Sequence, residues 1–293
     1  MQEPYPTFSA LPVDAKGPRG NAWGLWGSDD QLGTLNHLTA EPGLSREQAT
    51  LAFNILGRGS KLPSSTNYPE FMPLTTNGRS TRNVAANGTD ADIMHTKKKD
   101  VHHMAQSGIA GRAYFLDWYD WATKEQGRTI DTTSPHFIPF SELHQTALHQ
   151  GISLDTMRTG DILVVRSGYL AQYASMPEEK RAQLDHEYET TKPSNIGVEA
   201  SEDLLSFLWD KQIAAVAGDS RSFEAWPCPE EKKQWHLHQW LLAGWGMPIG
   251  ELWDLERLSE VARKLGRYTF FLTSAPMNVP GGVASPPNAL AFF

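Results

Sequence analysis

Residues that commonly perform acid–base or metal chemistry are concentrated between residues 217 and 251. Two carboxylates, Asp219 and Glu224, precede His238, and a third, Glu251, follows it. Imidazole and carboxylate side chains serve in proteins both as metal ligands and as general acids and bases. We therefore predict that His238, Asp219, Glu251 and Glu224 form the catalytic group.

Each of these residues also has a structural alternative. Asp219 follows an apolar run, and ligands bind at the carboxyl ends of such strands in open α/β sheets, but the alternative is a cap on the next segment. Glu224 either lines a pocket or pairs with Arg221. His238 is alternatively a hydrogen-bonded structural histidine. On a helix His236 would point in a different direction, so we expect only one of the two rings to face the site.

Aromatic residues surround the same part of the sequence. The chain contains ten tryptophans, more than a core needs, and Trp226 and Phe223 lie in the loop that carries Glu224. These two residues, with Trp23 and Trp26 near the N-terminus, are the candidate substrate-binding residues. Together they predict an aromatic-lined pocket for a small apolar substrate. For Trp23 and Trp26 the alternative is packing or a dimer contact.

The composition limits the function classes. The 293 residues carry a net charge of −8, and no basic block exceeds residues 97–99, so a nucleic-acid partner is not expected. One cysteine, Cys228, excludes an internal disulfide framework and multi-cysteine zinc sites. No segment reaches the roughly 18 apolar residues of a membrane span, and the N-terminus lacks a signal-peptide pattern. We expect a soluble cytoplasmic protein with no membrane partner.

From residue 113 onward, apolar runs and amphipathic segments alternate, as is typical of an α/β fold. Residues 1–60, rich in proline and glycine with a capped helix at 45–57, are predicted to form an N-terminal extension that contacts a second subunit. Residues 61–293 then form a single α/β domain, with mostly turns in the tail at 280–293. The predicted strands are 113–117, 161–166, 213–217 and 268–273, and the predicted helices are 141–150, 178–188, 202–210 and 255–265, the last two capped by Ser201 and Asp254.

Several ordered blocks resemble the cyclase family, which includes bacterial kynurenine formamidase and isatin hydrolase, with the closest likeness to its fungal branch. The blocks are residues 30–36 (DQLGTLN), 108–112 (GIAGR), 160–166 (GDILVVR), 217–220 (AGDS), 238–251 and the glycine-rich tail 281–288. The resemblance implies a swivelling β/β/α architecture in a single domain. It also implies a homodimer in which N-terminal segments reach into the partner.

One part of the family pattern is missing. Hydrolytic members carry His-x-Gly-Thr-His-x-Asp-x-x-x-His, which supplies most of their metal ligands, and nothing between Pro63 and Gly111 matches it. His238 and Glu251 occupy the positions of the remaining ligand pair. The spacing of the histidines at 95, 102 and 103 fits no compact metal pattern. Two ligands seldom hold a catalytic metal, so we expect neither a metal nor another cofactor.

These observations favour a metal-independent enzyme of secondary metabolism, a lyase or cyclase. It would catalyse ring formation, addition or elimination, including dehydration followed by hetero-cycloaddition, on an apolar aromatic or polyketide–terpenoid substrate. The alternatives are a metal-dependent amide or lactone hydrolase of the kynurenine formamidase type, a non-catalytic binding paralogue, and a gene model that lacks an exon.

Overall fold

The structure is a computed structural model that describes residues 5–38, 101–191, 193–279, 284–286 and 288–293. The predicted helix at 45–57, the boundary between residues 60 and 61, and position 95 lie outside the described residues. Within them, no helix is long and apolar enough to cross a bilayer.

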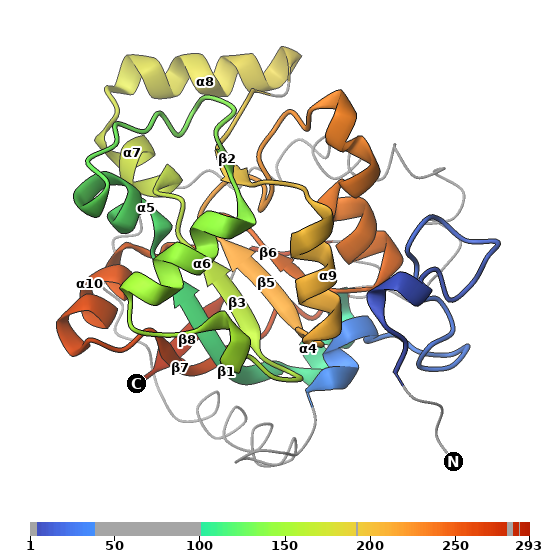
Figure 1. Cartoon of the computed structure of the whole chain (residues 1–293). Helices are drawn as coiled ribbons and strands as arrows, with labels where there is room; N and C mark the ends of the chain where they lie inside the picture. Colours follow the sequence, from blue (N-terminus) through green and yellow to red (C-terminus); the bar gives the residue numbers. More distant parts are fainter. Residues whose placement is uncertain (1–4, 39–100, 192, 280–283, 287) are drawn as a thin grey trace.

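A six-stranded mixed sheet lies at the centre of the molecule, in the order β6-β5-β3-β1-β7-β8 (Figure 1). Four neighbouring strands are mutually parallel, whereas β7 is antiparallel to β1 and β8 is antiparallel to β7. A separate pair, β2 (Phe137–Ile138) and β4 (Gly197–Val198), is parallel. The strands of the large sheet are β1 (Ile109–Leu116), β3 (Ile162–Val165), β5 (Ala215–Gly218), β6 (Ile249–Gly250), β7 (Thr269–Ser274) and β8 (Ala289–Phe292).

Helices cover both faces of this sheet, which confirms the predicted α/β class. Successive side chains of β1 point to opposite faces, so Tyr114 lies in one apolar cluster and Phe115 in the other. The first cluster includes Leu143 of α6 and Leu204 of α9, and the second includes Ala262 of α10. The longer helices are α4 (Val101–Ser107), α6 (Phe140–His149), α7 (Tyr169–Ser175), α8 (Glu178–Thr190), α9 (Glu202–Asp210) and α10 (Glu256–Leu265).

Short helices connect these elements. They include two π-helices, η3 (Trp121–Glu125) and η6 (Gln239–Gly244), and the short α5 (Trp118–Asp120). The 3-10 helices are η1 (Phe8–Ala10), η2 (Gly33–His37), η4 (Leu154–Thr156) and η5 (Glu230–Trp235).

Most predicted elements are present, with two corrections. The Ser201 hydroxyl accepts the N–H of Leu204, as expected of the predicted cap of α9. In α10 the capping position is Leu255, although the Asp254 carboxylate still accepts the Glu256 N–H. The tail was predicted to be mostly turn, but it ends in β8, because β7 offers this short apolar segment a backbone to pair with.

The N-terminal segment, residues 5–38, has little regular structure and packs against its own chain. The Trp209 indole N–H donates to the Pro6 carbonyl over 2.8 Å. The Trp23 indole N–H donates to the Ala243 carbonyl over 2.9 Å, and the Trp26 ring packs edge-on to His37. Both predicted dimer-contact tryptophans therefore have partners within the chain, and the homodimer stays a prediction.

Candidate active site

His238 lies between two carboxylates. Its Nδ1 is 2.5 Å from Oε1 of Glu224, and its Nε2 is 3.1 Å from Oε1 of Glu251. The exposed fractions of the three side chains rise from 2% for Glu224 through 11% for His238 to 29% for Glu251. The row, which we call the open cluster, thus runs from the interior to the surface.

The loop that carries Glu224 is fixed to the small sheet. Val198 of β4 forms a bridge with Glu224, and the Ala225 N–H donates to the Val198 carbonyl over 3.0 Å. A β-carbon at Gly197 would lie 2.3 Å from the carbonyl carbon of Glu224, so the backbones approach at a distance only glycine permits. The Glu224 carboxylate also accepts the N–H groups of Leu237 and His238, at 2.6 and 3.0 Å. Backbone contacts therefore hold Glu224 in place independently of its contact with the imidazole.

Glu251 is held at the other end of the row. It directly follows β6, and its Oε1 accepts the Phe223 N–H over 2.9 Å. The same backbone loop therefore positions both carboxylates that flank His238.

The two carboxylates keep the imidazole charged. Burial lowers the pKa of His238, but the charges and hydrogen bonds of Glu251 and Glu224 outweigh it and raise the pKa to about 10. For Glu224 burial acts in the other direction and raises the pKa. The hydrogen bond and charge of His238 outweigh this effect, so the pKa of Glu224 is lowered overall. His238 is therefore an imidazolium at neutral pH, and its Nε2 and Oε1 of Glu251 form an adjacent donor and acceptor.

The expectation that only one of the two histidines faces the site is wrong. His236 lies between η5 and η6 in a non-helical conformation, so the two rings do not diverge as on a helix. Its Nδ1 is 3.5 Å from Oε1 of Glu224, and the two ring centroids are 6.0 Å apart. Trp226 packs edge-on to His236 with a centroid distance of 6.2 Å.

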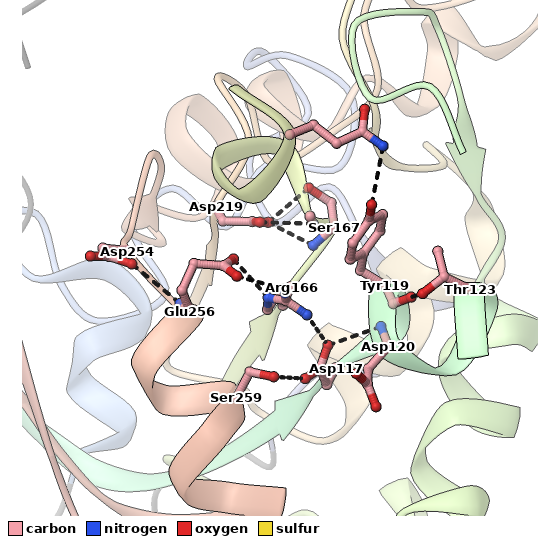
Figure 2. Close-up of polar contacts among 12 residues, drawn as sticks. Asp117, Tyr119, Asp120, Thr123, Arg166, Ser167, Asp219, Asp254, Glu256 and Ser259 are labelled. Atoms are coloured by element: carbon pink, nitrogen blue, oxygen red, sulfur yellow. Dashed lines mark hydrogen bonds and ion pairs between the residues drawn. The ribbon is translucent and has the colours of Figure 1, made fainter. Parts of the chain in front are cut away.

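Asp219 belongs to a different group. It directly follows β5 and is fully buried; Oδ1 accepts the N–H and hydroxyl of Ser167 at 2.6 and 2.7 Å, and Oδ2 accepts the Gly168 N–H at 2.8 Å. Burial raises the pKa of Asp219 to about 6, against the opposing effect of these donors. Figure 2 shows the carboxylate joining the ends of β5 and β3. The carboxylates in contact with His238 are Glu224 and Glu251, whereas Asp219 bonds to Ser167 and Gly168, so the structure does not bring all four predicted catalytic residues into one group.

Asp219 lies beside a buried ion network that the sequence reasoning missed. The Arg166 guanidinium donates to Asp117 over 2.7 Å and to both carboxylate oxygens of Glu256, at 2.9 and 2.7 Å (Figure 2). The Ser259 hydroxyl donates to the other oxygen of Asp117. We call Asp117, Arg166, Asp219 and Ser259, all buried, the closed cluster. Its sequence signal was present, since Asp117 and Arg166 each directly follow a buried strand.

The four predicted aromatic residues separate into three places. Trp226 is partly exposed beside His236, whereas the Phe223 side chain is buried in the core. Trp23 and Trp26 lie in the N-terminal segment. A cavity of about 10 Å³ beside Phe223 and Asp219 has room for about one water and is too small for an organic substrate. Among these aromatic residues, Phe223 contacts the open cluster through its backbone N–H on Glu251, and Trp226 packs against the neighbouring His236.

The donor set for a metal is incomplete among the described residues. Nε2 of His238 and Oε1 of Glu251 are two adjacent donors, and a carboxylate on Nδ1, as Glu224 provides, is the usual support of a metal-bound histidine. A catalytic metal normally takes three protein ligands, and the described part of the chain contains no group of three or more His, Cys, Asp or Glu able to hold one. The described residues alone do not fit a catalytic metal, and we assign no step to one.

Comparisons with known proteins identify the fold. A crystal structure described as a novel cyclase matches with a TM-score of 0.63 over 93% of this chain and 99% of that chain, at 22% sequence identity. Isatin hydrolase A from Ralstonia solanacearum matches with a TM-score of 0.42 and 14% identity, over 66% of this chain and 64% of its own. Isatin hydrolase A from Labrenzia aggregata, bound to benzyl benzoate, gives 0.47 and 14%, over 68% and 66%. No protein-family model and no curated protein matches the sequence. The match to the cyclase structure confirms the predicted family resemblance for the fold.

Proposed function

We propose that this chain, which has the fold of that cyclase, is an enzyme that eliminates water from an apolar aromatic substrate and closes a ring on the product. The observation that carries the proposal is the contact of His238 with both Glu224 and Glu251, in a row that reaches the surface at Glu251. An acid and a base lie side by side there, as an elimination requires.

In the proposed reaction, His238 and Glu251 remove one water molecule from an ortho-hydroxybenzyl alcohol. Glu251 accepts the phenol proton, and Nε2 of His238 gives its proton to the benzylic hydroxyl, which leaves as water when the C–O bond breaks. The product is an ortho-quinone methide. Glu251 then returns its proton to Nε2 across the 3.1 Å that separates them, which restores the starting state.

The coupling of the two groups makes a strongly bound proton available. While Glu251 is charged, it helps to hold the proton on His238. Once Glu251 has taken the phenol proton, the imidazolium keeps one carboxylate partner, Glu224, and becomes a stronger acid. Proton release therefore accompanies substrate deprotonation.

Ring closure needs no further proton. A quinone methide and an alkene form one C–C and one C–O bond with no atom lost. Holding both partners in a reactive orientation lowers such a barrier by up to about 7–11 kcal/mol. We assign the apolar wall for the substrate to the partly exposed indole of Trp226, which packs edge-on to His236.

The test uses an ortho-hydroxybenzyl alcohol that carries an apolar alkene, with and without a chelator. We expect wild-type protein to form the cycloadduct above the uncatalysed rate under both conditions, and Glu251→Gln to lose this activity because it cannot accept the proton. Equal rates with and without wild-type protein would disprove the proposal, and so would full activity of Glu251→Gln.

A second candidate is a metal-dependent amide or lactone hydrolase. The adjacent Nε2 of His238 and Oε1 of Glu251, with Glu224 on Nδ1, favour it. Hydrolysis of an aryl formamide that depends on added Zn²⁺ or Mn²⁺ and is abolished by Glu251→Gln would support this candidate instead. Binding of the benzyl alcohol with no turnover of either compound would identify a binding protein.

A further inference from the structure

His238 is followed at once by a π-helix. It occupies the capping position of η6, so the path of η6 sets where the imidazole points. A π-helix is a rare conformation that needs support from its surroundings, and such turns are frequent at functional sites. The contacts that hold η6 therefore bear on the geometry of the open cluster.

The N-terminal segment supplies several of these contacts before and along η6. The Arg19 guanidinium lies 4.7 Å from the centre of the Trp235 ring and donates to the Gln234 side chain over 3.1 Å. The backbone carbonyl of Gln234 accepts the Trp240 indole N–H over 2.8 Å. The Phe8 ring stacks on Trp240 with a centroid distance of 5.4 Å.

Other contacts hold the end of the π-helix. The Ala22 N–H donates to the Gly244 carbonyl over 3.0 Å, and the Trp23 indole N–H donates to Ala243. The Trp245 indole N–H donates to the Gly20 carbonyl over 2.8 Å. The same N-terminal stretch therefore grips η6 on both sides of the turn that carries His238.

Gly20 makes the closest approach. Its φ is +70°, and a β-carbon there would lie 1.9 Å from the Trp240 ring, two residues beyond His238. Gly24 has a similar φ of +84°, but a β-carbon there would meet nothing within 4 Å. The two glycines share the same backbone strain on substitution and differ in whether the new atom strikes Trp240.

We infer that residues 5–23 form a brace that fixes η6 and thereby positions His238 between Glu224 and Glu251. Gly20 and Arg19 are positioning residues, because they act through Trp240, Trp235 and Gln234. The inference rests on the proposed function only for its effect on turnover, since the position of the ring is a property of the folded protein.

The test compares Gly20→Ala with Gly24→Ala in the full chain. The first readout is the NMR signal of the His238 ring N–H groups, which their hydrogen bonds to carboxylates shift far downfield; it is assigned by its loss in His238→Gln. We expect Gly20→Ala to shift or abolish this signal and Gly24→Ala to leave it in place. With the benzyl alcohol substrate, Gly20→Ala lowers kcat by about 100-fold, the cost of a displacement of about 1 Å, and changes KM little.

The inference is overturned if Gly20→Ala leaves the ring signal unchanged, or if Gly24→Ala removes it equally. Should circular dichroism show that Gly20→Ala does not fold, Arg19→Met decides, because it removes the cation over Trp235 without adding an atom next to Trp240. The His238 ring signal must shift in Arg19→Met, and in Arg19→Lys it must return part of the way to its wild-type position. A wild-type protein with an intact ring signal and no turnover contradicts the proposed function and leaves the brace standing.

Discussion

Four charged residues directly follow the four parallel strands, yet they belong to two different environments. Along the sheet from β6 to β1 they are Glu251, Asp219, Arg166 and Asp117. The last three are buried and belong to the closed cluster, where backbone N–H groups or opposite charges hold them. Glu251 belongs to the open cluster instead and is the member of that cluster that reaches the surface. All four charged residues therefore lie at strand ends. They differ in exposure to solvent, which distinguishes the candidate catalytic residue Glu251 from the three residues that support the structure.

The largest effect expected from the open cluster is on rate. His238→Gln should lower turnover of the proposed substrate by about two to four orders of magnitude, the usual contribution of an acid–base group. The amide can still donate to Glu224, so circular dichroism should show a folded protein. Turnover at the wild-type level would mean that His238 has no part in proton transfer.

The closed cluster should respond in stability. Arg166→Met leaves Asp117 buried without its cation and should lower the free energy of unfolding in urea by about 3–5 kcal/mol. The matched control is Arg263→Met, which breaks the exposed pair with Asp120 and should cost about 0–1 kcal/mol. If the two variants are equally stable, the closed cluster does not hold the strand ends together.

A second histidine, His37, sharpens the comparison through its pH dependence. His37 is buried beside Tyr5, and burial lowers its pKa to about 4, opposite to the shift of His238. With an unfolded-state pKa of about 6.5, the neutral ring contributes stability that is fully present above pH 6.5 and is lost as the pH falls toward 4. Relative to His37→Gln, wild type should lose about 2 kcal/mol between pH 7 and pH 5. A constant difference between the two proteins in urea titrations at both pH values would refute this.

The smallest predicted effect concerns substrate binding. Trp226→Ala removes an apolar wall beside the open cluster and should raise KM roughly two- to tenfold, the equivalent of about 0.5–1.5 kcal/mol, with kcat nearly unchanged. Trp26→Ala, which acts on the N-terminal segment, should leave KM unchanged. An equal rise in both variants would return Trp26 to the substrate-binding group.

The sequence predicted the sheet better than the site. Periodicity and capping residues located β1, β3, β5 and β7 because those signals are local. The strands β6 and β8 of this sheet were missed. In β8, four exposed or partly exposed residues become a strand only through pairing with β7.

The roles of the candidate residues depended on contacts that periodicity does not encode. Asp219 was correctly placed at a strand end, but its partners lie on Ser167 and Gly168, about 50 positions earlier in the chain. The contact of Glu224 with His238 arises because the loop between β5 and η5 folds back onto β4. Helical geometry was the wrong guide to His236 and His238, because the 3-10 helix η5 ends just before His236, which is non-helical, and the π-helix η6 begins just after His238.

The brace also has a consequence for biosynthesis. Pro6 and Gly20 bond to indole groups that lie 203 and 225 residues later in the chain. At a ribosomal rate of about 5–20 residues per second, roughly 10–45 s pass between the synthesis of these partners. Tyr5, Phe8 and Trp23 leave the ribosome long before the segment that covers them exists, and are available to chaperones in the interval. The N-terminal brace is thus synthesised early but packs late. A nascent chain can complete the proposed active site only after η6 has been translated.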